Sequence, residues 1–389
     1  MAHDVFSDKQ IAAKHQAGFN ISVADYLGRI FGYEFIPGPV GGLGITFSSA
    51  INQTKFIDHE TPFPIIQYNE IDTFDPVFFD LQFPTGNATI YDITPFEFGA
   101  WSGSIGAFTP TEWLGTSLSG GVPVNESACV RGFDRAGFLI GTSADTFDAW
   151  YIQALSNGTE AQFAKRSSGA GNRIDGTDRS AKRQSAAMDE LLQIIPESFS
   201  KVFGLNITSS SYAVFPNPFA NLSSTSSVVN HSKDLRLVDG SESGQAIPLW
   251  GLIQPARGLE FIIAWDDNED AAPYQWNNGT NLYNSYLAAN ASKISFLIVL
   301  PAVTFVNKNF THKPVFFGCD PLLTTTRDAN GPIILYFADA SYSAYTNYSY
   351  SQSNRSNRTL DPDWPVCLGC AAIDRSLSKG LGRMNEVVP

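Results

Sequence analysis

The sequence has few charged side chains and no long hydrophobic run. Only 16% of its 389 residues are charged, and 38 acidic against 25 basic side chains give a net charge of −13. A pI near 4.8 leaves no basic surface for phosphate backbones, which excludes nucleic acid as a partner. The longest apolar stretch, residues 294–301, is far shorter than the ~20 residues that span a bilayer, so no transmembrane segment is expected.

Histidine is also scarce, and the five present are scattered without HxxxH spacing: His3, His15, His59, His231 and His312. This gives no local support for a histidine-based zinc site or for a serine–histidine–aspartate triad. The acidic run at 265–270 is similar to a calcium loop, but Ala271 replaces its glycine and Asn277 its glutamate, so a solvated turn is expected instead. No metal and no cofactor are expected.

Aromatic residues and glycosylation sequons are abundant by contrast. The 29 Phe, 14 Tyr and 7 Trp can bury a large core, which excludes a disordered chain. An excess of N-x-[S/T] sequons indicates N-glycosylation of a secreted chain, with sequons arising from Ser/Asn-rich loops as the alternative. There are fourteen: Asn20, Asn52, Asn87, Asn125, Asn157, Asn206, Asn221, Asn230, Asn278, Asn290, Asn309, Asn347, Asn354 and Asn357.

The cysteines and the chain ends also bear on whether the protein is secreted. Cys129, Cys319, Cys367 and Cys370 allow three disulfide pairings, and structural disulfides are favoured over a redox or metal role for the lone C-L-G-C. The opening residues contain no apolar stretch of a signal peptide, and the last residues no hydrophobic tail of a lipid anchor. We therefore expect a portion of a secreted, extracellular or cell-wall-associated protein whose signal peptide lies upstream.

Hydrophobic periodicity predicts an α/β fold. Apolar spacings of three and four indicate helix between Lys9 and Phe35, ended by P-G-P-V-G-G-L-G. Continuous apolar runs bounded by Gly, Pro or Asp are typical of parallel strands covered on both faces, and they occur at 235–239, 259–266 and 332–337.

Residues 158–189 differ in composition, with two Lys-Arg pairs among Ser, Gly and Ala, and are expected to form a flexible basic insertion. An amphipathic helix is expected to follow at 189–203.

Asp239 and Ser119 are the candidates for chemistry. Asp239 follows an apolar run and precedes Gly240, at the carboxyl end of an expected strand, where open α/β sheets place active sites; Asp-Gly is also a common turn signal. Ser119 lies in G-T-S-L-S-G-G, a loose match to a nucleophile elbow, but no buried strand precedes it and no helix can follow directly. Nothing singles out the carboxylate pair of a glycoside hydrolase.

Residues 237–280, LVDGSESGQAIPLWGLIQPARGLEFIIAWDDNEDAAPYQWNNGT, resemble the fungal secreted lysophospholipase (phospholipase B) family, relatives of cytosolic phospholipases with a patatin-like catalytic core. The likeness covers nearly the whole chain except the basic insertion, including G-A-F-T-P-T-E-W-L-G at 106–115 and K-P-V-F-F-G-C-D at 313–320. It implies a layered α/β/α acyl-hydrolase core, incomplete at the N-terminus, with residues 1–389 forming the C-terminal portion of a single catalytic domain.

The resemblance also implies a serine–aspartate dyad that hydrolyses the fatty-acyl ester of lysophospholipids. In the family a G-x-S-G-G serine attacks the ester, and the aspartate of a D-G-G motif is the general base. The aspartate maps onto Asp239, with Ser241 in place of the second glycine. The serine lies upstream of the part that resembles residues 17–29, so this chain carries only the aspartate and is expected to be inactive alone. A non-catalytic secreted glycoprotein on the same scaffold, either a pseudoenzyme or a lipid-binding module, is the alternative.

The expected partners are a lysophospholipid or phospholipid substrate, transient contact with a lipid surface, and N-linked glycans. A carboxylate base with a pKa near 3.9 stays ionised in acid, whereas an imidazole with a pKa near 6.5 becomes protonated. The complete enzyme is therefore expected to work at acidic pH.

Overall fold

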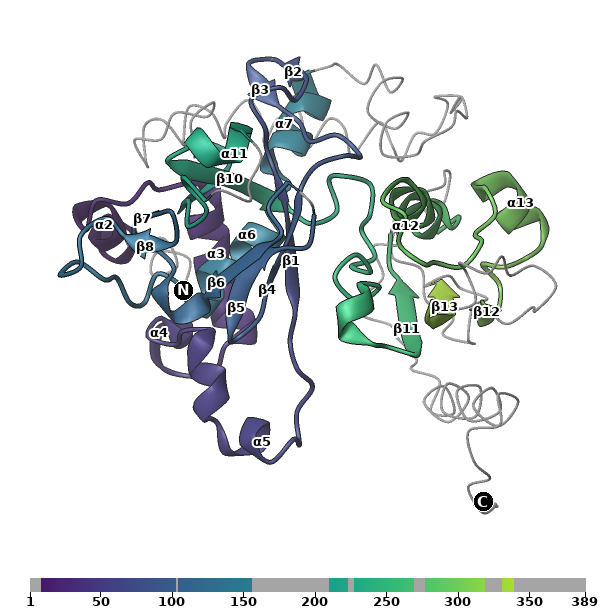
Figure 1. Cartoon of the computed structure of the whole chain (residues 1–389), viewed down its shortest axis with the longest axis horizontal. Helices are drawn as coiled ribbons and strands as arrows, with labels where there is room; N and C mark the ends of the chain where they lie inside the picture. Colours follow the sequence, from purple (N-terminus) through teal and green to yellow (C-terminus); the bar gives the residue numbers. More distant parts are fainter. Residues whose placement is uncertain are drawn as a thin grey trace. The chain divides into compact units, whose positions relative to one another are not determined.

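The computed structural model describes residues 8–102, 104–155, 210–222, 227–268, 277–318 and 331–338 (Figure 1). The chain divides into two compact units, one comprising Met1–Ser167 with Asn172–Ser243 and the other Ser168–Gly171 with Gly244–Pro389. The expected insertion at 158–189 and the expected helix at 189–203 lie outside the described residues, and a single domain across the whole chain stays a prediction.

The first unit is built on a six-stranded antiparallel sheet with the strand order β6-β5-β4-β1-β10-β9. Its strands are β1 (Ile66–Glu70), β4 (Ile90–Ile93), β5 (Glu97–Ala100), β6 (Ala107–Pro110), β9 (Ala213–Pro216) and β10 (Asp234–Asp239). In the register of the central strand, Tyr68 stands opposite Tyr91 on one side and Asp239 on the other. The sheet therefore places Asp239 beside the middle of β1.

The expected strand at 235–239 is confirmed as β10, but its expected parallel pairing is wrong, because both of its neighbours are antiparallel. Leu235 and Leu237 pack into the main core on one face, and Val238 belongs to a smaller cluster on the other. A continuous apolar run reports burial of both faces and carries no information on strand direction. The same pattern thus arises here in an antiparallel sheet.

Helices and short elements complete this unit: α2 (Asp8–Gln16), α3 (Val23–Phe35), α4 (Pro39–Gly42), η1 (Ser48–Asn52), α5 (Thr54–Ile57), β2 (Val77–Phe78), β3 (Leu81–Gln82), η2 (Thr111–Trp113), β7 (Leu118–Ser119), β8 (Val122–Pro123), α6 (Ala136–Ser143), α7 (Phe147–Leu155) and α11 (Ser227–His231). The helix expected between Lys9 and Phe35 is therefore two helices. A new helix starts at Val23 because Ser22 caps it: the Ser22 amide donates to the Asp25 carboxylate at 2.9 Å.

Helices α3 and α6 touch through glycine. A Cβ on Gly28 would lie 2.6 Å from the carbonyl oxygen of Gly137, and a Cβ on Gly137 would lie 2.6 Å from that of Gly28. Any larger residue at either position would push the two backbones apart. Because α6 also packs on β1 and β10, this contact sets how closely the helical layer covers the sheet.

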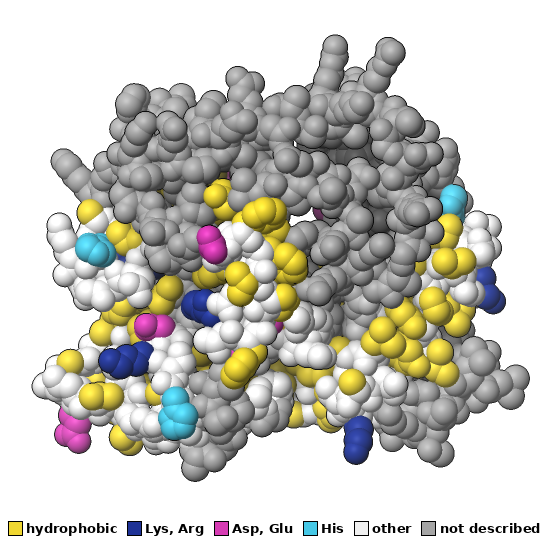
Figure 2. Space-filling model, turned by 90° about the horizontal axis from the view of Figure 1, so that it is seen from above, with side chains coloured by type: hydrophobic (Ala, Val, Ile, Leu, Met, Phe, Trp, Pro, Cys, Tyr) yellow, Lys and Arg dark blue, Asp and Glu magenta, His cyan; other side chains and the backbone are white. Residues whose placement is uncertain are grey.

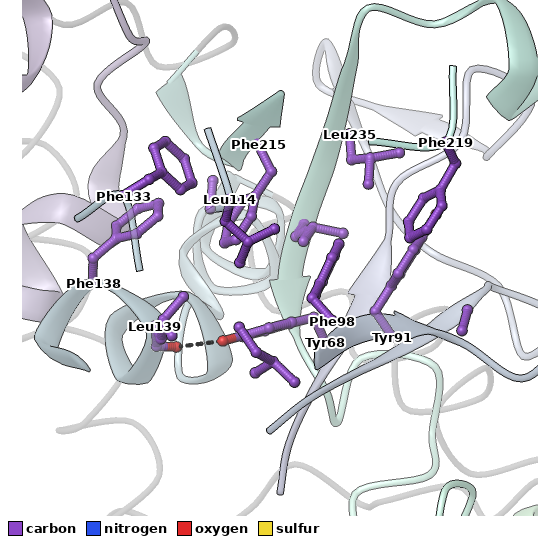
Figure 3. Packing of buried hydrophobic residues seen from close by; sticks show 14 of the residues in the cluster. Tyr68, Tyr91, Phe98, Leu114, Phe133, Phe138, Leu139, Phe215, Phe219 and Leu235 are labelled. Carbon is purple, nitrogen blue, oxygen red and sulfur yellow. Dashed lines mark hydrogen bonds between the residues drawn. The ribbon is translucent and has the colours of Figure 1, made fainter. Parts of the chain in front are cut away.

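The core between these helices and the sheet is rich in aromatic residues (Figure 3). Tyr91 stacks on Phe98 with ring centroids 5.2 Å apart, and Phe98 lies 5.8 Å from Phe215. The Tyr68 hydroxyl donates to the Leu139 carbonyl at 3.2 Å, the dashed line in Figure 3, and so links β1 to α6. Aromatic packing and one buried hydrogen bond thereby fix the strand that borders β10.

The second unit contains a three-stranded sheet in the order β11-β13-β12, with β11 (Phe261–Asp266), β12 (Val315–Phe317) and β13 (Ile333–Ala338). The strands expected at 259–266 and 332–337 are confirmed, and β11 and β13 are parallel as the pattern predicts. Its other elements are η4 (Pro255–Arg257), α12 (Thr280–Ala291) and α13 (Ala302–Asn307). Phe305 of α13 packs edge-on against Tyr336 of β13 at 5.1 Å.

The surface is sparsely charged, and on the face drawn in Figure 2 charged side chains stand singly between hydrophobic patches. Of the nine sequon asparagines in the described ranges, Asn230 and Asn278 are half-buried. The other seven are exposed: Asn20, Asn52, Asn87, Asn125, Asn221, Asn290 and Asn309. Among the helices that the structure describes, none has the length and apolar character to cross a bilayer. Cys129 is exposed and unpaired, and the other three cysteines lie outside the described residues.

Candidate active site

Asp239 is the last residue of β10, and its backbone is held from two sides. The Asn69 side-chain amide donates to the Asp239 carbonyl at 2.9 Å, and the Asp239 amide donates to the Asp145 carbonyl at 3.2 Å. Gly240 follows because the chain turns directly against β1: a Cβ there would lie 2.9 Å from the Gln67 carbonyl oxygen. The Asp-Gly pair is therefore a packing requirement as well as a turn signal.

Ser241 orients the Asp239 carboxylate. Its amide donates to Oδ1 at 2.6 Å, and its hydroxyl donates a further hydrogen bond to the same carboxylate. Burial raises the pKa of Asp239 above its ordinary 3.8, and the two bonds from Ser241 oppose that rise by favouring the charged form. A half-buried carboxylate in a fixed orientation can act as a proton acceptor.

Three further carboxyl groups surround this end of β10. Asp145 lies between α6 and α7, Asp148 lies in the first turn of α7, and Glu242 follows Asp239 by three residues. Their exposed fractions are 0%, 0% and 7%. Burial, reinforced by the negative charges of the neighbouring acids, raises the pKa of Asp145 and Glu242 well above the ordinary carboxyl values, and burial raises that of Asp148 to about 7.

Asp148 and Glu242 are buried close together, and besides burial itself the negative charge of Asp148 raises the pKa of Glu242. None of their four carboxyl oxygens has a hydrogen-bond partner among the described residues. Burial without compensating hydrogen bonds favours the neutral, protonated form of a carboxyl group. The pair therefore keeps a proton at a pH at which an ordinary carboxyl group has lost it.

Within the part of the chain that the structure describes, several buried oxygens near Asp239 have no hydrogen-bond partner. Besides the Asp148–Glu242 pair, they include Asn69 Oδ1, Asp145 Oδ2 and Ser243 Oγ. Buried polar atoms in native proteins are normally paired, and the exceptions call for a functional or mechanistic reason. Their concentration beside Asp239 marks this end of the sheet as the candidate active site.

Ser119 does not lie in a nucleophile elbow. It ends the two-residue strand β7, which turns directly into β8, and its hydroxyl accepts a hydrogen bond from the Asn221 side chain at 3.0 Å. The strand-turn-helix geometry that an elbow needs is absent around this serine. The objection raised by the sequence is confirmed.

Asp266, in the acidic run of the second unit, is fully buried rather than solvated. Its carboxylate accepts the Tyr336 hydroxyl at 2.5 Å and the Asn268 side chain at 2.6 Å, while Asn277 donates to its carbonyl at 2.6 Å. The bond with Tyr336 ties the end of β11 to β13. The bonds with Asn268 and Asn277 tie it to residues that lie between β11 and α12 in the sequence. The described residues contain no group of three potential ligands arranged to hold a metal ion.

The mixed α/β architecture defines the fold class, which is confirmed. Human GIVD cytosolic phospholipase A2 superposes on this chain with a TM-score of 0.52 and 16% sequence identity, covering 86% of this chain and 39% of that one. At this identity the likeness concerns the fold alone.

The family model of the lysophospholipase catalytic domain matches residues 4–385, so the chain belongs to this family. It is 34% identical over 396 residues to Lysophospholipase 3 of Aspergillus fumigatus and 32% identical over 391 residues to Lysophospholipase 1 of Candida albicans. These alignments cover 95% and 94% of this chain but 56% and 58% of the relatives. The chain therefore spans little more than half the length of these relatives, and the resemblance noted from its motifs is confirmed.

Sequence reasoning identified Asp239 and missed the acids around it. Asp145 and Asp148 precede Asp239 by some ninety residues, and acidic residues at such positions are common where a helix starts. Glu242 carried a weak signal, since it directly follows the D-G-S turn. Only the fold brings the four carboxyl groups together.

Proposed function

We propose that this chain carries the general base of a lysophospholipase, and that Asp239 is that base. In the reaction a serine hydroxyl attacks the acyl ester while Asp239 accepts its proton, and Asp239 then passes this proton to the departing alcohol as the acyl-enzyme forms. Water then attacks the acyl-enzyme while Asp239 accepts a proton from it, and transfer of that proton to the serine oxygen releases the fatty acid and restores the serine. Family membership supports the reaction class.

The observation that carries the assignment of Asp239 is the contrast between it and its neighbours. The pKa values of Asp145 and Glu242 are raised well above the ordinary range, and that of Asp148 is raised to about 7, so these three acids retain protons in acid. Burial raises the pKa of Asp239 as well, but the hydrogen bonds from Ser241 oppose that rise by favouring its ionised form. This difference from the neighbouring acids supports Asp239 as the base.

The nucleophile of the proposed dyad is a G-x-S-G-G serine, and no such motif occurs in these 389 residues. We therefore infer that the chain by itself does not hydrolyse lysophospholipids and that it acts together with the serine-bearing part of a longer protein. We also infer secretion and N-glycosylation, supported by the sequons and by the exposure of seven of the nine described sequon asparagines.

An exchange experiment tests this function. The part of Aspergillus fumigatus Lysophospholipase 3 that matches this chain is replaced by the chain, and fatty-acid release from lysophosphatidylcholine is measured. We expect an active protein, because the relative supplies its own serine. Asp239→Ala in the exchanged protein should lower the rate by about 10²–10⁴-fold, the usual contribution of a general base.

Asp58→Ala, on the exposed surface of the same unit, is the matched control and should leave the rate unchanged. A folded exchanged protein without activity, checked by circular dichroism, would favour the non-catalytic alternative. An active one that is indifferent to Asp239→Ala would refute the role of Asp239 while leaving the reaction class intact.

A further inference from the structure

A cavity of about 490 Å³ lies in the first unit, enclosed by α2, α3, α4 and the segment 130–138. Its size falls within the range of about 300–1,000 Å³ that is typical of small-molecule sites. Asp239 and the surrounding acids do not line it. It is therefore separate from the candidate active site.

The cavity is basic in an acidic protein. Four basic side chains line it, Lys14, Arg29, Arg131 and Arg135, against the single acid Asp25, whereas the whole chain carries −13. Two of the four are neutralised: Lys14 pairs with Asp25 at 2.7 Å, and Arg131 pairs with an exposed glutamate at 3.3 Å. Arg29 and Arg135 have no carboxylate partner among the described residues.

These two guanidinium groups are held in place by backbone carbonyls. Arg29 donates to the Val40 carbonyl at 2.7 Å, and Arg135 donates to the carbonyls of Leu43 at 2.7 Å and Gly132 at 3.1 Å. A guanidinium has five N–H donors, so both keep donors for a ligand, and their planar fork matches a carboxylate or a phosphate. Fixing them in advance lowers the entropy cost of binding.

The backbone beside them is also unusual. Three successive residues, 40–42, are left-handed, with φ of 55°, 60° and 60°. Gly41 and Gly42 both line the cavity, so this turn forms part of its wall.

The remainder of the wall is apolar. Phe19, Phe133 and Phe138 line the cavity together with Ile11 and the side-chain stem of Lys14, whose ammonium lies 3.5 Å from the centre of the Phe138 ring. Phe133 and Phe138 are themselves in edge-to-face contact at 5.5 Å, so this wall is a packed surface (Figure 3). An aromatic floor below fixed guanidinium groups suits a molecule with an anionic head and a hydrocarbon chain.

We propose that this cavity binds an anionic amphiphile, with a carboxylate or phosphate head between Arg29 and Arg135 and an alkyl chain against Phe19, Phe133 and Phe138. A fatty acid and a lysophospholipid with a terminal phosphate share this chemistry. The site acts as a binding site in its own right, so it does not depend on the activity proposed for Asp239.

Equilibrium dialysis with the isolated chain tests the proposal without any catalysis. Laurate and dodecyl phosphate, below their micellar concentrations, represent the two sources of the anionic head. Both should bind saturably to one site, and whichever binds more tightly identifies the preferred head. Dodecyltrimethylammonium, dodecanol and acetate, which lack the anionic head or the chain, should each bind at least tenfold more weakly.

Two sets of variants locate the site. The double variant Arg29→Gln/Arg135→Gln should weaken laurate binding at least tenfold, whereas Lys55→Gln, an exposed cation on α5, should not. Ala13 on α2 lines the cavity, so Ala13→Phe places a ring into it without changing the arginines and should abolish binding. Gln16 on the same helix does not line the cavity, so Gln16→Phe should leave binding intact.

Circular dichroism establishes that each variant is folded, and the Ala13/Gln16 pair keeps the test valid if the arginine variant does not fold. The proposal is overturned if laurate and dodecyl phosphate fail to bind, if dodecanol or the quaternary ammonium binds as tightly as laurate, or if Ala13→Phe has no effect. Loss of activity in the exchanged lysophospholipase would not change any of these outcomes.

Discussion

The buried Asp148–Glu242 pair should make this fold more stable in acid than at neutral pH. Burial raises the pKa of Asp148 from its ordinary 3.8 to about 7. When the pKa of a carboxyl group is higher in the folded chain than in the unfolded chain, its contribution to the free energy of unfolding is fully present below the unfolded pKa. That contribution is lost as the pH rises from the unfolded pKa through the folded pKa. The loss for Asp148 therefore falls between about pH 4 and pH 7.

The size of the effect follows from the gap between the two pKa values. A gap of about 3 pH units, at about 1.4 kcal/mol for each, corresponds to about 4 kcal/mol of unfolding free energy lost between pH 4 and pH 8. Glu70, whose pKa burial raises to about 7, acts in the same direction. Asp148→Asn keeps the shape of the protonated group and cannot ionise, so its unfolding free energy should vary less with pH, by about 2–4 kcal/mol.

Urea unfolding followed by circular dichroism at pH 4.5, 6.0 and 7.5 measures this dependence in the parent chain and in Asp148→Asn. Asp58→Asn, an exposed acid in the same unit, is the control and should retain the parent slope. Two results would refute the reasoning: a parent chain that is as stable at pH 7.5 as at pH 4.5, or an Asp148→Asn variant with an unchanged slope.

Three other experiments test separate features of the protein. Gly137→Ala places a Cβ 2.6 Å from a carbonyl oxygen of α3 and should cost about 1–3 kcal/mol in urea unfolding, whereas Gly44→Ala, with nothing closer than an Arg side chain at 3.8 Å, should cost far less. Ser241→Gly removes the hydroxyl bond to Asp239 and should raise the pKa of Asp239, shifting the acid limb of the exchanged enzyme's pH–rate profile upward, while Ser241→Thr keeps it. Peptide mapping of the protein after expression through a fungal secretory pathway should find glycans on the seven exposed sequon asparagines and none on the two half-buried ones.

The sequence predicted the elements that depend on local pattern. The strand that ends in Asp239 was recognisable because an apolar run stops at Asp-Gly, and β11 and β13 were recognisable because their apolar runs are bounded by Gly, Pro or Asp. Strand direction was not recoverable for β10, because burial by layers on both faces gives an antiparallel strand the pattern of a parallel one.

The sites depend on contacts between distant segments, which periodicity does not encode. Asp145 and Asp148 reach the end of β10 only because the segment between α6 and α7 hydrogen-bonds to the Asp239 amide. Arg135 joins the cavity beside Arg29 through a hydrogen bond to a carbonyl 92 residues away. Each of these residues alone has the sequence context of an ordinary helix end or surface position.

The pH–rate profile of the exchanged lysophospholipase tests most directly whether Asp239 is the proton acceptor. We predict that kcat/KM is retained as the pH falls through the range in which an imidazole, with its pKa near 6.5, becomes protonated. At lower pH it should decline along a single acid limb, whose pKa lies above the ordinary carboxyl value of 3.8. Asp239→Asn should remove that limb together with most of the rate. A tenfold loss per pH unit beginning near pH 6.5, or an Asp239→Asn variant with the parent profile, would contradict the central claim.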